Sequence, residues 1–174
     1  MQYKEKLRAW NSTEKYKSEM LFLNKLLPNP KYALEYGSGR GMCAYIIGAD
    51  GYDVNDYNEC LKPYEYYTQL PDNDYTDVYF MHVFAHLPNP KDVLRILKSK
   101  YPKATITVIT PNDNWIKLQN NPDYKPDPTV YKHYSMTELK QLFEDCGYKV
   151  ELIGQFGEVM NGVNERIFLQ AYAI

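Results

Sequence analysis

Three glycines at alternate positions, Gly37, Gly39 and Gly41, separate two apolar runs of the chain. Glycine adopts positive φ angles without strain and lets a ligand approach the backbone closely. A dinucleotide-binding turn would have its third glycine at position 42, which is Met42 here, and the Gly-Lys-Ser/Thr end of a phosphate-binding loop is absent. The turn therefore predicts a site for a nucleoside without phosphates, although a tight turn with no ligand would have the same residues.

The glycine turn lies between elements that alternate along the chain. Apolar runs bounded by Gly and Pro predict strands, and apolar residues at helical spacing predict helices. The expected strands are 32–36, 52–56, 78–81, 104–110, 149–153 and 166–172, and the expected helices are 13–27, 42–49, 90–100 and 135–146. This alternation predicts an α/β fold with a doubly wound, mostly parallel sheet, and the last two strands predict an antiparallel hairpin at its C-terminal edge. Ligands of such sheets bind at the carboxyl ends of the strands.

The composition is that of a single globular domain. The chain has 174 residues, 44% of them hydrophobic and 24% charged, and a formal net charge of −2, which excludes a disordered chain. No run approaches the roughly 18 apolar residues of a membrane span, and the polar N-terminus has no apolar signal segment, so we expect a cytoplasmic protein. We expect one domain over 1–174, with a helical cap (1–30) and a core (31–174). The lack of a basic excess and of metal-ligand spacing disfavours a nucleic-acid binder and a metal site.

Four parts of the sequence resemble, in the same order, motifs of the class I S-adenosylmethionine-dependent methyltransferases. ALEYGSGRG (33–41) resembles the first motif, and DVYFMHVFAHLPNP (77–90) resembles the fourth strand with the helix entry after it. TVITPN (107–112) resembles the fifth strand, while KHYSMTEL (132–139) and DCGYKV (145–150) resemble a late block. The resemblance is closest to a compact branch of the family (types 11, 12 and 23) and covers about residues 30–155. It implies a Rossmann-like fold and S-adenosylmethionine as the cofactor.

The resemblance also assigns expected roles to individual residues. The methionine part of the cofactor would lie against the glycine loop, and the motif I acid would lie near its amino group; these residues are Glu35, Gly37, Ser38, Gly39 and Gly41. An acid at the end of the second strand would hold the ribose hydroxyls, since a carboxylate accepts from both. One alignment places Asp56 there, which we favour, and another places Asn58 there. Met81 and His82 would border the reactive end. About twenty residues separate Asp56 from Asp77, so the third strand must be short or missing.

Methyl transfer from a sulfonium needs mainly the positioning of a nucleophile. A general base is useful only where the acceptor carries a proton, and the candidates are His82, His86 and His133. His82 is the best placed, at the carboxyl end of a strand; each of the three could instead have a structural role. The segment 111–134 is the longest irregular stretch and could form a lid over an acceptor with Trp115, or be a plain surface loop.

The sequence does not identify the acceptor. Met81-His82-Val83-Phe84 stands where enzymes that methylate DNA amino groups have a Pro-Pro pair, and no Cys follows Pro, as the cytosine-5 enzymes require. DNA is therefore disfavoured. We expect a methyltransferase that acts on a small molecule, with RNA or protein left open by the Lys-rich N-terminus. The alternative is a non-catalytic module that binds the cofactor or a protein partner, because Ala85 replaces a glutamate of the family motif.

Overall fold

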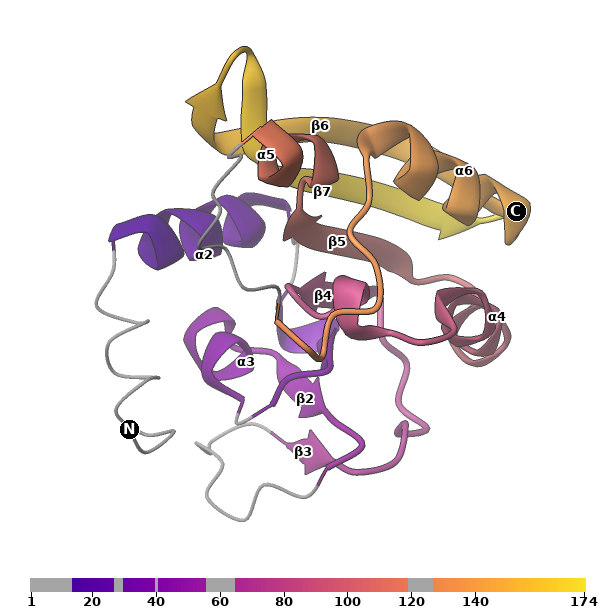
Figure 1. Cartoon of the computed structure of the whole chain (residues 1–174). Coiled ribbons are helices and arrows are strands. Elements are labelled where there is room, and N and C mark those ends of the chain that lie inside the picture. The colour runs from indigo at the N-terminus through magenta and orange to yellow at the C-terminus, as the bar shows by residue number, and fades with distance from the viewer. Residues whose placement is uncertain (1–13, 27–29, 40, 56–64, 119–126) are drawn as a thin grey trace.

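The computed structural model describes residues 14–26, 30–39, 41–55, 65–118 and 127–174. Its centre is a seven-stranded sheet in the order β3-β2-β1-β4-β5-β7-β6 (Figure 1). The strands are β1 (Ala33–Tyr36), β2 (Asp50–Tyr52), β3 (Tyr66–Tyr67), β4 (Asp77–Met81), β5 (Thr105–Pro111), β6 (Tyr148–Met160) and β7 (Val163–Ala173). The first five pair in parallel, and β7 is antiparallel to both β5 and β6. The predicted α/β sheet with its antiparallel C-terminal hairpin and short third strand is confirmed.

Helices cover both faces of the sheet, as the alternation of strands and helices predicts. They are α2 (Glu14–Leu26), η1 (Pro30–Tyr32), α3 (Met42–Ile47), η2 (Phe84–His86), α4 (Pro90–Lys100), α5 (Asp113–Leu118) and α6 (Met136–Asp145). Figure 1 shows α2 and α3 on one side of the sheet and α4 and α6 on the other. None of the helices in the described ranges is long and apolar enough to cross a membrane.

The two faces form two hydrophobic cores because successive side chains of a strand point in opposite directions. On β4, Val78 and Phe80 pack with Leu94 of α4 and Phe143 of α6. Tyr79 and Met81 pack on the other face with residues of α2 and α3, which include Met20, Leu23, Cys43 and Ile47. All five residues of β4 are buried. The central strand is thus fixed from both sides, and so is the position of its carboxyl end.

Local sequence signals set most element boundaries. Pro90 stands at the start of α4, where its fixed φ is favourable, and Ser135 with Glu138 forms the predicted capping box of α6. Two predictions were wrong. The second strand is Asp50–Tyr52 rather than 52–56, because the chain turns away from the sheet after Asp53. The last two strands extend well beyond 149–153 and 166–172 and meet at a tight turn in which Asn161 and Gly162 have positive φ.

Candidate functional site

The loop from Gly37 to Gly41 connects β1 to α3 at the carboxyl edge of the sheet. Gly37, Gly39 and Gly41 have φ angles of 74°, 54° and 73°, which favour glycine over other residues. A Cβ at Gly37 would lie 2.5 Å from Cγ1 of Val83, just after β4. The amides of Gly37 and Ser38 both donate to the carbonyl of Tyr52, at 2.7 and 2.9 Å. The loop is therefore held between the ends of β2 and β4, as its glycines predict.

The acid that ends the second strand is Asp53. It directly follows β2 and is 9% exposed. One carboxylate oxygen accepts from the amide of Gly39 at 2.9 Å, and the other accepts from the backbone and side-chain nitrogens of Asn55 at 2.9 and 3.2 Å. The expected ribose ligands Asp56 and Asn58 lie outside the described residues.

The sequence does contain a local signal that β2 ends before Asp53, although a strand was expected over 52–56. Asp followed two residues later by Asn is typical of a turn in which the aspartate side chain accepts from the backbone. Such a turn ends the strand at Tyr52 and makes Asp53 the residue at its carboxyl end. The Tyr66 hydroxyl lies 3.0 Å from the carbonyl oxygen of Gly39 and 2.9 Å from that of Asn55. The short β3 therefore supports the same corner of the site.

Glu35 lies inside β1 and is 3% exposed. Its carboxyl accepts from the amide of Ala44 in α3 at 2.7 Å. Burial raises the pKa of Glu35 to about 8, because desolvation outweighs the hydrogen bonds from Ala44 and Cys43, and the charge of Asp53 adds to the increase. The expected motif I acid is thus largely protonated near neutral pH and fixes α3 against the strand that carries the glycine loop.

Ser38 and Met81, two further expected cofactor contacts, are both buried. No described residue is a hydrogen-bond partner for the Ser38 hydroxyl, which lies where a Cβ on Gly51 would come within 2.8 Å. Met81 belongs to the core between the sheet and α2 with α3. Because Met81 is the last residue of β4, its packing in that core also sets the position of His82, which follows it.

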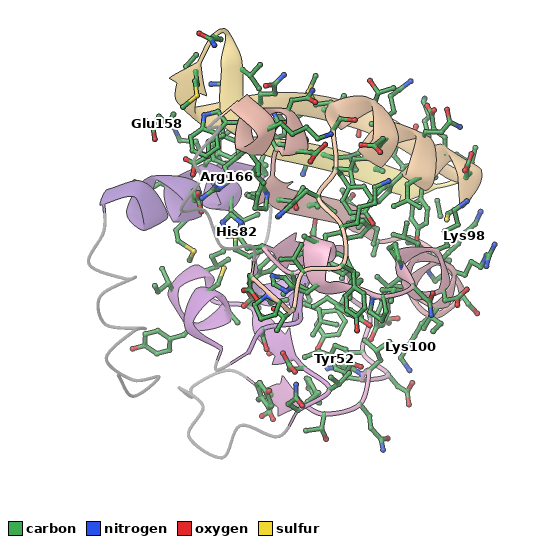
Figure 2. The ribbon with its side chains drawn as sticks, viewed as in Figure 1. Tyr52, His82, Lys98, Lys100, Glu158 and Arg166 are labelled. Carbon is green, nitrogen blue, oxygen red and sulfur yellow. The ribbon has the colours of Figure 1, made fainter. Side chains whose placement is uncertain are left out.

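His82 follows β4 directly and is one of two non-glycine residues in the described ranges with positive φ, 58°. Its amide donates to the carbonyl of Ile109 at 2.9 Å, which holds it against β5. Its Nε2 lies 2.5 Å from Oε2 of Glu19 on α2. Figure 2 shows the side chains of His82 and Arg166 close to α2. His82 is therefore at the expected edge of the sheet, and it has a carboxylate partner that the sequence did not indicate.

The other two histidines lie elsewhere. His86 Nδ1 lies 3.1 Å from the carbonyl oxygen and 2.9 Å from the hydroxyl of Thr129. The Nδ1 atom of His133 is buried without a hydrogen-bond partner among the described residues. Burial lowers the pKa of His133, and the charge of Asp113 opposes this decrease. Of the three histidines, His86 and His133 are close enough to interact electrostatically, and His82 contacts Glu19 of α2.

The segment 111–134 is less irregular than expected. It contains α5, and Asn112 forms a parallel bridge with Tyr134. Trp115 and Tyr134 are buried, whereas Tyr131 is 68% exposed. Tyr124 lies outside the described residues. Most of the described aromatic side chains of this segment therefore pack into the protein.

A surface cavity of about 610 Å³ lies between α6 and the segments before α4 and before α6. It is lined by residues that include Leu87, Lys91, Lys132 and Leu142. None of the described residues of the glycine loop lines it. Within the described ranges, no three His, Cys, Asp or Glu residues are grouped as metal ligands would be.

Several solved structures share this fold at low sequence identity. A SAM-dependent methyltransferase from Archaeoglobus fulgidus is 18% identical with a TM-score of 0.68, over 98% of this chain and 99% of that one. Magnesium protoporphyrin IX methyltransferase from Synechocystis is 14% identical with a TM-score of 0.64, over 91% of this chain and 81% of that one. A chain of the Pnkp1/Rnl/Hen1 RNA repair complex is 16% identical with a TM-score of 0.69, and 92% of this chain covers only 42% of that one. At these identities the similarity shows the fold.

Sequence comparison gives the family itself. No curated protein matches the sequence significantly. A family model described as a methyltransferase domain matches residues 3–153, which include the glycine loop, Asp53 and His82. Because this match extends over most of the sequence, the chain belongs to the methyltransferase domain family.

Proposed function

We propose that this chain is a methyltransferase that uses S-adenosylmethionine to methylate a small molecule. The observation that carries the proposal is the positive-φ glycine loop, held between the end of β2 and Val83 after β4. Membership of the methyltransferase domain family supports it. So do the fold neighbours, which include methyltransferases described as bound to S-adenosylmethionine or S-adenosylhomocysteine.

The residues at this edge fit the cofactor. The missing Cβ of Gly37 lets the loop lie against Val83 at the end of β4, and the positive φ angles of all three glycines set the shape of the loop. The carboxylate of Asp53 has four lone-pair positions and accepts from Gly39 once and from Asn55 twice, so one position on Oδ2 can still accept from a hydroxyl. We therefore propose that Asp53 accepts a hydrogen bond from one ribose hydroxyl, in the role expected from the sequence for Asp56 or Asn58.

The remaining residues of the site would maintain the shape of the glycine loop and position the acceptor. S-adenosylmethionine, when bound, supplies a methyl group on a positively charged sulfur. Because that methyl group is already activated, correct alignment of an acceptor can supply effective molarities on the order of 10⁵ M or more. Glu35 would keep α3 and the loop in place through its bond to the amide of Ala44. His82 would be the proton acceptor at the end of β4.

A second candidate function is a non-catalytic module that binds the cofactor or a partner protein. One observation favours it: Ala85, which replaces a glutamate of the family motif, is 2% exposed. Its carbonyl accepts from the amides of Tyr131 and Lys132 at 2.9 and 3.2 Å. This position supports the packing of the chain before α6 and offers no carboxylate to a substrate.

Calorimetric titration with S-adenosylmethionine and S-adenosylhomocysteine, with NAD as the control, tests the proposal. We expect micromolar binding of the first two, equivalent to about 8 kcal/mol, and none of NAD. Labelled S-adenosylmethionine with a panel of small-molecule acceptors then tests transfer. Binding without transfer to any acceptor would favour the non-catalytic candidate. A folded protein that binds neither adenosyl compound would contradict both the proposal and the cofactor-binding form of its alternative.

A further inference from the structure

A cluster of four charged or titratable side chains lies between α2, the end of β4 and β7. Glu19 Oε2 lies 2.5 Å from Nε2 of His82, and Glu19 Oε1 accepts from Nε of Arg166 at 2.8 Å. On its other side, Arg166 Nη1 lies 2.7 Å from Oε1 of Glu165. The side chains of Glu19 and Glu165 are 4% and 5% exposed, and those of His82 and Arg166 are 13% and 15% exposed. Three distant parts of the sequence thus meet in one largely buried cluster.

The contacts of Glu19 define the tautomer of His82. Burial alone would raise the pKa of Glu19, but the hydrogen bond and charge of His82 and the charge of Arg166 lower it below its usual value. An ionised carboxylate only accepts hydrogen bonds. Nε2 of His82 must therefore carry the proton that lies between the two groups, and Nδ1 is the basic nitrogen of the neutral ring.

The backbone places this imidazole at the reacting edge of the sheet. His82 takes a left-handed conformation, which is unfavourable for a residue with a Cβ. The hydrogen bond from its amide to the carbonyl of Ile109 maintains this conformation. The next residue, Val83, contacts Gly37 of the loop proposed to hold the cofactor. The backbone of His82 thus lies one residue from the contact with the glycine loop, at the carboxyl end of β4, and its ring contacts Glu19 of α2.

We propose that Glu19 is the positioning residue of a Glu19–His82 proton acceptor, and that the group methylated is a hydroxyl. This inference rests on the proposed methyltransferase function. The hydroxyl oxygen forms a bond to the methyl carbon, the carbon–sulfur bond breaks with its electron pair remaining on sulfur, and the hydroxyl proton passes to Nδ1 of His82. A hydroxyl needs such a base, because it is a poor nucleophile until its proton leaves. An amine, a pyridine nitrogen or a thioether attacks through a lone pair that it already has.

Two isosteric variants of the full chain separate positioning from charge. Glu19→Gln removes the carboxylate that faces His82, whereas Glu165→Gln removes the same charge from the cluster and keeps the Glu19–His82 contact. In proton NMR spectra we expect a strongly deshielded N–H resonance for the Glu19–His82 hydrogen bond. It should be present in the wild type and in Glu165→Gln and absent from Glu19→Gln. If the wild type lacks this resonance, or if Glu19→Gln retains it, the proposal is overturned.

Kinetics with labelled S-adenosylmethionine test the acceptor class. The panel pairs alcohols and phenols with pyridines and thioethers of similar shape. We expect transfer to hydroxyl acceptors, and in Glu19→Gln a kcat lower by about 10²-fold with KM changed far less. Transfer to pyridines or thioethers but not to hydroxyls, or an unchanged kcat in Glu19→Gln, would overturn the proposal. Calorimetry with S-adenosylhomocysteine on the wild-type protein tests cofactor binding, and therefore the proposed function, by itself. The NMR resonance needs no cofactor and tests the Glu19–His82 pair separately.

Discussion

Replacement of Gly37 by alanine should destabilise the protein through two effects that can be measured apart. The φ angle of 74° costs an ordinary residue about 1–2 kcal/mol. The new Cβ would also lie 2.5 and 2.7 Å from the two γ-carbons of Val83, closer than such atoms approach. Overpacking of this kind costs about 1–3 kcal/mol. We therefore expect Gly37→Ala to lower the free energy of unfolding by about 2–5 kcal/mol, the sum of the two effects.

Two further variants separate these effects in urea unfolding experiments. Gly162, in the turn between β6 and β7, has a φ of 79°, and a Cβ added to it would have no atom within 4 Å. Gly162→Ala should therefore show the backbone effect alone, about 1–2 kcal/mol. Val83→Ala removes both γ-carbons and leaves the Val83 Cβ at 3.1 Å from the new atom. In the double variant Gly37→Ala/Val83→Ala, a favourable coupling energy of about 1–3 kcal/mol should appear.

Comparison of Gly37→Ala with Gly162→Ala tests both structural features of Gly37. If Gly37→Ala costs no more than Gly162→Ala, the close approach of the glycine loop to Val83 is absent. If Gly37→Ala costs less than about 1 kcal/mol, the left-handed conformation of Gly37 is absent too. Either outcome would remove the structural basis for placing the cofactor at the glycine loop.

Three other predictions concern the ligand, the pH and the loop before α6. Asp53→Ala should weaken S-adenosylmethionine binding by about 1–3 kcal/mol in calorimetry. A larger loss of binding in Asp56→Ala would show that Asp56, and not Asp53, binds the ribose. Because the folded pKa of Glu35 is raised to about 8, the folded state binds more protons than the unfolded chain above pH 4.5. The free energy of unfolding should therefore fall as the pH rises toward 8, and Glu35→Gln should flatten this dependence; an equal slope in the variant would exclude Glu35 as its source. His86→Ala, which removes the contacts to Thr129, should speed amide hydrogen exchange around residues 129–132 while the global stability falls by only about 0.5–1.5 kcal/mol; unchanged exchange would contradict this anchoring role.

The parts of the fold that local patterns determine could be predicted from the sequence. The capping box at Ser135, Pro90 at the start of α4 and the apolar run of β5 each specify an element through nearby residues. β6 could not be predicted beyond 153, because Gly154 and Gly157 read as a break in a strand. Pairing with the long β7 overrides that local preference.

The site was predictable only where it is contiguous in sequence. The glycine loop is such a segment, and its φ angles agree with its residues. Asp53 was missed because the alternation of Tyr52, Val54 and polar neighbours resembles a continuing strand, whereas the Gly39 amide and the Asn55 turn end it. The partner of His82 could not be inferred at all, since Glu19 is 63 positions away and on a helix.

The position of β7 in the sheet has a consequence for folding. It is the last strand in the sequence, yet it lies between β5 and β6 and pairs with all seven residues of β5. A chain still emerging from the ribosome would therefore have β5 as an open edge, and the apolar residues of β5 would lack the cover of Ile167 and Leu169. Unpaired apolar edges favour aggregation, so the protein should be vulnerable until β7 has been synthesised and paired with β5. Arg166 belongs to the same strand, so its ion pair with Glu19 of α2 can form only after β7 has been added to the sheet.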